Sequence, residues 1–157
     1  MCDNMMDYEE IIKFSPFVLN HLISLKKTHD YYLNKFIDNE TEISYSQYYM
    51  FMLLYFEPDV NQSDIAKACF MNRSGVSRAF SDFEKKGLIE RKINPNNKRE
   101  YITTLTEKGL KTAKLLEEKE IEWDNMICEE LNMSRKELLQ LLSKVSMKSL
   151  NFNRENF

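Results

Sequence analysis

One predicted helix carries hydroxyl and cationic side chains on a single face. At about 100° per residue, the segment 73–86 separates apolar from polar side chains. The polar face consists of Ser74, Ser77, Arg78, Ser81 and Lys85. It contains no carboxylate, and the two acids of the segment, Asp82 and Glu84, flank it. Because small hydroxyls and long cations can approach phosphates and base edges without repulsion, this face predicts contact with duplex DNA.

The positive charge of the chain is concentrated in the region that contains this helix. The whole chain has a net charge of −3, which alone does not favour an anionic partner. Residues 61–105 hold nine Lys or Arg against five Asp or Glu, a net charge of +4, so the remainder carries −7. This distribution favours a localised anionic partner. A chance fluctuation of surface charge and a merely solvated helix face are the alternatives.

Two short helices joined by a turn are predicted around this face. The first starts near Asn61, and the second follows a turn around Asn72. Their inward side chains are Ile65, Ala66, Cys69, Val76, Ala79, Phe80 and Phe83. The ten-residue separation of Ala66 and Val76 lets the helices cross and share one small core, as in a helix-turn-helix.

A β-hairpin is predicted directly after Gly87, which ends the second helix. Residues 88–93 and 101–105 are short β-prone runs, and they bracket the polar, turn-rich stretch 94–100. Lys98 and Arg99 then lie at a basic tip that can follow the DNA backbone into a neighbouring minor groove. After a helix-turn-helix, such a hairpin is typical of a wing.

A long helix is predicted over residues 16–37. Ser15 is its expected cap, and Pro16 suits the first helical position, where its missing N–H is not needed. A heptad-like apolar seam is formed by Val18, Leu22, Leu25, His29, Tyr32 and Phe36. So long an apolar stripe in 157 residues predicts a partner subunit.

Three further helices are predicted around the helix-turn-helix and hairpin. A capping box at 44–47 opens one that runs to about residue 56. Thr106 opens another that runs to about residue 130. A second capping box at 134–137 opens the last, which is expected to end near residue 150 and leave a frayed tail over 151–157.

Several classes of protein are not favoured by the sequence. No apolar run approaches the roughly 18 residues of a membrane span, and the acidic N-terminus lacks the features of a signal peptide, so a cytoplasmic protein without a membrane partner is predicted. Cys2, Cys69 and Cys128 lie far apart with no CxxC pair, so neither a disulfide framework nor a metal site is predicted. Without an HExxH, Walker or GxGxxG motif, we predict no catalytic residues and no cofactor.

The segment 61–109 resembles the winged helix of the MarR family of transcriptional regulators. The motifs that carry the resemblance are IAKACFMNRSGVSR, FEKKGLIER, the asparagine-rich wing and LTEKG. The order of the surrounding helices agrees as well, so the resemblance covers nearly the whole chain. It implies a mainly α winged helix-turn-helix fold with a two-stranded β-wing, as a single domain over 1–157. Its expected parts are dimerisation helices over 8–38 and 106–150 and a DNA-binding lobe over 44–105, with the helix-turn-helix at about 61–86 and the wing at 88–105.

The resemblance also implies a function. The resemblance implies a homodimeric repressor that binds a pseudo-palindromic operator in double-stranded DNA. A small effector is expected to weaken this binding. By position, the resemblance implies that Asn72 caps the recognition helix, that Arg73, Ser74, Ser77 and Arg78 face the DNA, and that Arg99 is the wing arginine. Ser63, Ser81 and Lys98 complete the predicted set of DNA-binding residues. Three positions depart from the family pattern: Asn97 replaces the aspartate of the wing, Phe70 replaces a small turn residue, and Gly75 replaces a residue with a side chain.

Two further hypotheses concern what the protein senses and whether it binds DNA at all. An effector cavity between the dimerisation and DNA-binding parts would be lined by His21, His29, Tyr32, Tyr48 and Tyr49, although aromatics at helical spacing are more often core. The three cysteines are interpreted as structural or incidental rather than redox sensors. The alternative function is a winged-helix module that docks proteins and does not bind DNA.

Overall fold

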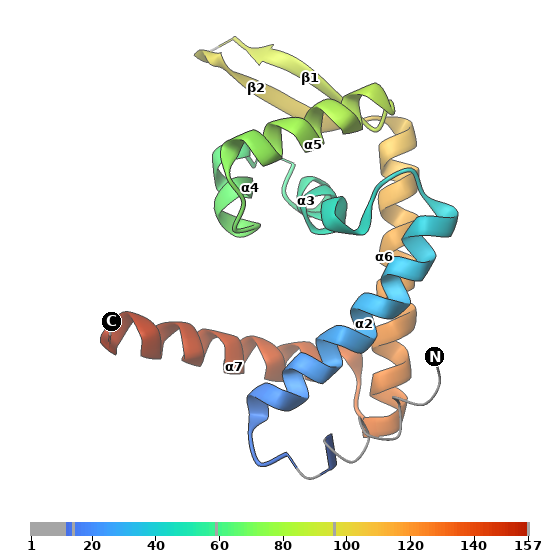
Figure 1. Cartoon of the computed structure of the whole chain (residues 1–157), viewed down its shortest axis with the longest axis vertical. Coiled ribbons are helices and arrows are strands. Elements are labelled where there is room, and N and C mark those ends of the chain that lie inside the picture. Colours follow the sequence, from blue (N-terminus) through green and yellow to red (C-terminus); the bar gives the residue numbers. More distant parts are fainter. Residues whose placement is uncertain (1–11, 14, 59, 96, 157) are drawn as a thin grey trace. The chain divides into compact units, whose positions relative to one another are not determined.

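The part of the chain that the structure describes is mainly α-helical and contains one two-stranded antiparallel sheet, as predicted (Figure 1). The computed structural model describes residues 12–13, 15–58, 60–95 and 97–156, without the side chains of 97–100 and 156. Its helices are α2 (Val18–Glu40), α3 (Tyr45–Phe56), α4 (Gln62–Ala68), α5 (Arg73–Lys85), α6 (Glu107–Leu131) and α7 (Arg135–Asn156). Its strands are β1 (Ile89–Asn94) and β2 (Asn97–Leu105). The chain forms two compact units, Met1–Leu116 and Glu117–Phe157, so α6 begins in the first and ends in the second.

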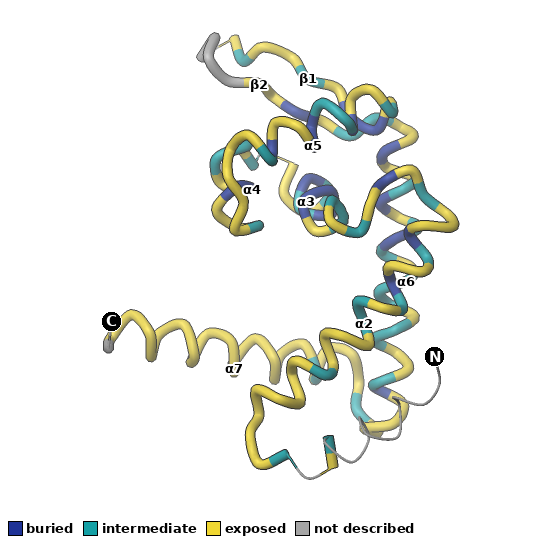
Figure 2. The backbone as a smooth tube through the Cα atoms, viewed as in Figure 1, coloured by how far each residue is buried: buried dark blue, intermediate teal, exposed yellow. Residues whose placement is uncertain are grey.

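The core of the first unit is built around α3 and α5 (Figure 2). Phe51 of α3 and Phe83 of α5 are fully buried, and their rings meet edge-on with centroids 5.2 Å apart. Burial of one such side chain contributes about 1.5–3 kcal/mol. Other members of the same cluster are Leu33, Ile37, Ile65, Val76, Phe80, Leu88, Ala113 and Leu116. This core fixes the apolar face of α5 inward and leaves its polar face outward.

The predicted helix starts at residues 61, 72 and 44–47 are confirmed by their hydrogen bonds. The side chain of Asn61 accepts a hydrogen bond from the backbone N–H of Asp64 (3.0 Å). The side chain of Asn72 accepts one from Gly75 N–H (2.7 Å). The backbone N–H of Ser44 donates to Gln47 Oε1 (3.0 Å), which is half of a capping box.

The hairpin differs from the prediction at its tip. The pairing is regular from Ile89 opposite Leu105 to Ile93 opposite Tyr101, but Asn94 then pairs with Asn97. The register therefore shifts, and residues 98–100 belong to β2 rather than to a long turn. The expected loop over 94–100 is wrong because the turn closes within 94–97.

Two helix boundaries also differ from the prediction. The first long helix begins at Val18 rather than at residue 16, and Ser15 does not cap it, since its hydroxyl accepts from Asn20 Nδ2 instead (2.8 Å). The last helix continues to Asn156 rather than fraying after residue 150. No glycine or proline stands in residues 151–156 to end it.

Only part of the apolar seam predicted along the first helix is buried in the core of the first unit. Val18, Leu22 and Leu25 are exposed, whereas Leu33 and Ile37 are fully buried. The second half of α2 therefore packs into the core of the first unit, and the first half presents apolar side chains to solvent.

Candidate nucleic-acid interface

The helices α4 and α5 form the predicted helix-turn-helix. Ile65 and Ala66 of α4 and Val76 and Phe80 of α5 are all buried in the shared core, as the ten-residue spacing predicts. The connecting turn spans residues 69–72. With its apolar face fixed by this core, α5 can turn only its polar face to a partner.

The exposed face of α5 collects most of the predicted DNA-binding residues. Asn72, Arg73, Ser74, Ser77, Arg78 and Lys85 are exposed, Ser81 is half-buried on the same helix, and Ser63 is half-buried on α4. The hydroxyl of Ser74 donates to Asn72 Oδ1 (2.8 Å), so both belong to the cap of α5. Among the side chains that the structure describes, none forms an ion pair with Arg73, Arg78 or Lys85. These cations are therefore available to an external anion.

The acids that flank this face are neutralised by neighbouring cations. Asp82 Oδ2 accepts hydrogen bonds from Lys86 Nζ (2.6 Å) and Gln47 Nε2 (2.8 Å). Glu84 accepts from Arg91 of β1, at 3.0 Å for the Nε donor. These contacts, those of Lys86 and Arg91 first, hold the pKa values of Asp82 and Glu84 below their usual range. Both carboxylates stay ionised and paired, so they do not cancel the positive potential of α5.

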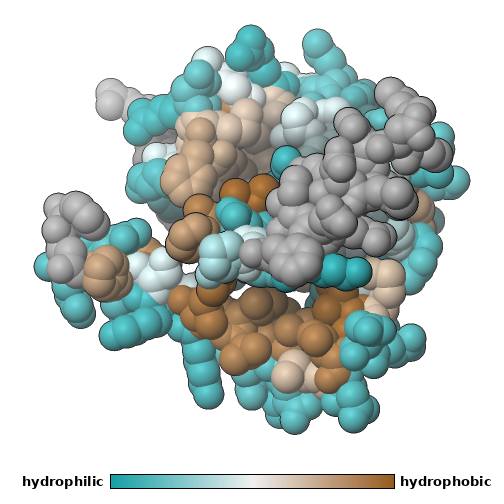
Figure 3. Space-filling model, turned by 60° about the horizontal axis from the view of Figure 1, so that its bottom comes forward, coloured by the Kyte–Doolittle hydropathy of each residue, from teal (hydrophilic) through white to brown (hydrophobic). Residues whose placement is uncertain are grey.

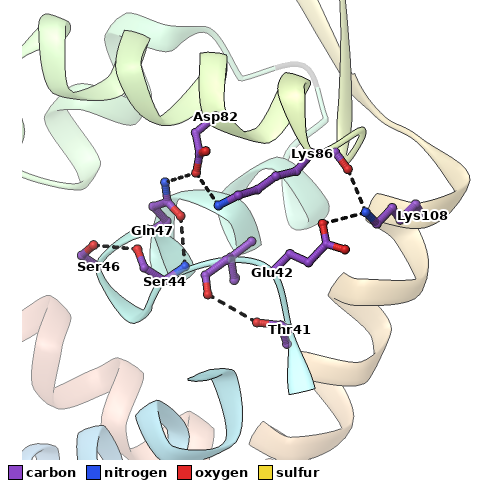
Figure 4. A network of polar contacts seen from close by, with 9 residues as sticks. Thr41, Glu42, Ser44, Ser46, Gln47, Asp82, Lys86 and Lys108 are labelled. Atoms are coloured by element: carbon purple, nitrogen blue, oxygen red, sulfur yellow. Dashed lines mark hydrogen bonds and ion pairs between the residues drawn. The ribbon is translucent and has the colours of Figure 1, made fainter. Parts of the chain in front are cut away.

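A polar network joins the C-terminal end of α5 to α3, to α6 and to the connection between α2 and α3 (Figure 4). Gln47 reaches Asp82 from α3, and Lys108 of α6 donates to the backbone carbonyl of Lys86 (2.9 Å) and to Glu42 (2.7 Å). Sequence reasoning missed these partners of α5. The Asp82–Lys86 spacing of four residues is a signal visible in the sequence, but the contacts to Gln47 and Lys108 are not.

Substitution of Asp82 by asparagine should lower stability at neutral pH by about 0.5–1 kcal/mol, the scale of a half-exposed ion pair. Because the folded pKa of Asp82 lies below its unfolded value, this contribution is present above about pH 4 and is lost as the pH falls through the folded pKa. Urea unfolding at pH 7 and pH 2.5 measures the difference. Asp38→Asn, an exposed aspartate of α2, is the control and should change neither value; a wild-type advantage that persists undiminished at pH 2.5 would contradict the pairing.

The side chains of the predicted wing residues Lys98 and Arg99 lie outside the described residues. Their backbone belongs to β2, next to the register shift. Lower in the hairpin, the Arg91 guanidinium lies over the ring of Tyr101, 5.5 Å from its centroid. Arg91 thus pairs with Glu84 and stacks on Tyr101, which ties the wing to α5.

The two departures from the family pattern in and after the turn have distinct geometries. Phe70 adopts a left-handed backbone with φ of 52°, and its side chain is 99% exposed. At Gly75, an added Cβ would lie 3.1 Å from both Met71 Cε and Asn72 Oδ1. Met71 therefore occupies part of the space that a side chain at position 75 would need.

The five residues of the effector hypothesis occupy different environments. His21 lines a hollow along α2 together with Leu22, Leu25 and Thr28. That hollow does not include His29, Tyr32, Tyr48 or Tyr49. Tyr48 is half-buried with its ring parallel to that of Tyr45, 6.3 Å away, whereas Tyr49 is exposed.

Cys69 and Cys128 differ in their exposure to solvent. Burial raises the pKa of the half-buried Cys69 thiol, Cys128 is buried, and Cys2 lies outside the described residues. Within the described part of the chain, no group of three or more His, Cys, Asp or Glu is arranged to hold a metal ion. No helix in that part is both long enough and apolar enough to span a membrane.

Comparisons with known proteins agree on one family. The profile described as the MarR family matches residues 41–100, which include the helix-turn-helix and most of the hairpin. The uncharacterized HTH-type transcriptional regulator YdgJ of Bacillus subtilis (strain 168) is 32% identical over 69 residues, 44% of this chain and 42% of its own length. The HTH-type transcriptional regulator BilQ of Clostridium symbiosum (strain WAL-14163) is 32% identical over 100 residues, 59% of this chain and 69% of BilQ. The chain thus spans less than half of YdgJ but more than two thirds of BilQ.

Solved structures share the fold. A MarR transcriptional regulator from Methanosarcina mazei Go1 has a TM-score of 0.72 at 22% identity, covering 87% of this chain and 98% of that one. The DNA complex of S. aureus MepR has a TM-score of 0.66 at 20% identity, covering 87% and 99%. Taken together, the family profile over the winged helix, the identity across most of BilQ and the shared fold show that this chain belongs to the MarR family of transcriptional regulators.

Proposed function

We propose that this protein is a homodimeric, sequence-specific DNA-binding repressor that acts in the cytoplasm and responds to a small molecule. The observation that carries the proposal is the electrostatics of α5: its outward cations have no ion-pair partner among the described side chains, while Asp82 and Glu84 are paired. The fold is also that of MepR, whose structure contains DNA. Family and relatives are transcriptional regulators, and no catalytic activity is proposed.

In this proposal α5 is the recognition helix in the major groove. Its N-terminal residues and Arg78 contact base edges, and Ser63 of α4 lies towards the phosphate backbone. Lys98 and Arg99 of the wing contact phosphates or enter the minor groove. Phosphate contacts supply most of the affinity and make it depend on salt.

The homodimer is supported by apolar side chains that are exposed in both compact units of the chain. Figure 3 shows a band of apolar side chains on the face turned towards the viewer. The exposed apolar residues of α7 are Leu139, Leu141, Leu142, Val145, Met147, Leu150 and Phe152. A helix that presents so many apolar side chains to water marks an interaction surface. We assign this surface to a second copy of the chain, because a symmetric dimer presents two recognition helices to the two half-sites of an operator.

Substitution of Val145 by aspartate should convert the dimer to monomer, because it places a charge in the apolar surface of α7, where Val145 is 50% exposed. Light scattering after size exclusion should give the mass of two chains for the wild type and of one chain for the variant. Asn151→Asp adds the same charge at an exposed polar position about 120° around α7 from Val145 and should stay dimeric. A wild-type monomer, or a dimeric Val145→Asp, would contradict the assignment of this surface.

The proposed function is tested by fluorescence anisotropy with the DNA upstream of the protein's own gene and with a scrambled duplex. We expect two chains per duplex, preference for the upstream sequence, and a loss of about 10³–10⁵ in affinity between 50 and 200 mM salt for six to ten phosphate contacts. Half-sites should lie about 10 base pairs apart, centre to centre. Absence of binding to either duplex at low salt would favour the protein-docking module instead.

A further inference from the structure

The turn between α4 and α5 has a backbone geometry that ordinarily requires glycine. Met71 N–H donates to the carbonyl of Ala66 (2.9 Å), and Phe70 N–H donates to that of Lys67 (3.2 Å). These two bonds form a Schellman motif, in which the residue at the position of Phe70 is left-handed and usually Gly. The φ of Phe70 is 52°, a conformation that is an outlier for a bulky residue.

The phenyl ring of Phe70 is not buried in the core, so it adds no packing energy to the fold. Phe70 is 99% exposed, and the next most exposed large apolar side chain of the described residues, Tyr31, is 74% exposed. A strained backbone that supports a fully exposed ring points to a role in binding rather than in folding.

Met71 extends the same apolar surface onto the recognition helix. A Cβ at position 75 would lie 3.1 Å from Met71 Cε, so the methionine side chain covers the first turn of α5 at Gly75. Phe70 and Met71, which we call the turn patch, are followed directly by Asn72 and Arg73. The turn patch is thus continuous in the chain with residues assigned to the DNA interface.

We propose that the turn patch contacts the 5-methyl group of a thymine in each operator half-site, in place of the side chain that Gly75 lacks. Apolar contact with this methyl group is one of the ways in which proteins recognise thymine in the major groove. The hydroxyl and guanidinium groups of α5 make polar contacts, and the turn patch adds two large apolar side chains beside them. The inference rests on the proposed DNA-binding function.

The test begins with selection from a library of random 26-base-pair duplexes by the wild type and by Phe70→Gly, with sequencing of the bound DNA. The wild type should enrich one thymine per half-site that the variant does not. Replacement of that thymine by uracil, which lacks the methyl group, should lower wild-type affinity about fourfold per half-site, the value of one buried methylene-sized group. The affinity of Phe70→Gly should be unchanged by uracil, and Phe70→Asn, which also tolerates the left-handed backbone, should behave like it.

The controls separate this inference from the proposed function and from misfolding. Phe56→Ala removes an exposed ring at the end of α3 and should leave selection and uracil sensitivity as in the wild type. The melting temperature of Phe70→Gly should equal or exceed that of the wild type, since glycine relieves strain; a lower value would assign Phe70 to the fold and overturn the inference. Identical motifs and uracil responses in wild type and variant would overturn the inference alone. Failure of the wild type to select any motif would overturn the proposed function with it.

Discussion

Substitution of Arg78 by alanine should weaken operator binding by about 1–3 kcal/mol at each half-site and relax the preference for one base pair. Arg78 is exposed on the outward face of α5 and forms no ion pair with any side chain that the structure describes. Its guanidinium can therefore engage a guanine edge or a phosphate without first breaking an internal contact. Because the proposed dimer uses two recognition helices, the loss of binding free energy occurs at both half-sites. Anisotropy titration at fixed salt measures the total loss.

Arg154→Ala is the matched control for this prediction. It removes an exposed arginine from the last turn of α7, so it changes the net charge equally without touching α5. Its operator affinity should remain close to that of the wild type. Equal affinities for Arg78→Ala and the wild type would show that the outward face of α5 is not the DNA-binding face.

Substitution of Gly109 by alanine should destabilise the protein by about 3 kcal/mol, because the added methyl group overpacks the start of α6. The new Cβ would lie 2.0 Å from the backbone carbonyl oxygen of Leu88 and 3.3 Å from Leu105 Cδ2. A backbone oxygen cannot swing aside, and Leu88 also accepts a hydrogen bond from Thr106 N–H (3.0 Å). In a chain of this length the melting temperature should fall by about 6–12 °C, which calorimetry can measure.

Gly75→Ala provides a control at the same position of another helix. Gly75 and Gly109 are each the third residue of their helix, and each N–H donates to a capping side chain, Asn72 (2.7 Å) or Thr106 (3.0 Å). At Gly75, however, the nearest atoms belong to flexible side chains 3.1 Å away. The gain in helix propensity, about 1 kcal/mol, offsets the crowding, so stability should change by less than about 1 kcal/mol. Similar losses in the two variants would show that the Leu88 contact is not the cause.

Local signals in the sequence were sufficient to predict the elements of the winged helix. The caps at Asn61 and Asn72 act on residues three positions away, and the apolar spacing of α5 determines which face is buried. The outward position of Arg78 follows from that spacing alone. The resemblance at LTEKG includes Gly109, but only the structure gives the reason, which is the approach of the Leu88 carbonyl.

Features that depend on residues far apart in the chain could not be predicted. The Gln47–Asp82 bond joins residues 35 positions apart, and the Lys108–Glu42 pair joins residues 66 apart. The register shift in the hairpin depends on how two strands meet rather than on either strand by itself. The sequence also marks Phe70 as unusual, yet its left-handed backbone and full exposure become evident only in the structure.

In the proposed dimer, the apolar surface of α7 makes the stability of the protein depend on its concentration in the cell. When a second copy covers that surface, unfolding of the dimer releases two chains, and each tenfold dilution costs about 1.4 kcal/mol of stability per dimer. Dilution also separates the paired recognition helices of the proposed dimer. The number of molecules in the cell therefore sets the occupancy of a two-half-site operator more steeply than a monomeric binder of equal affinity would allow.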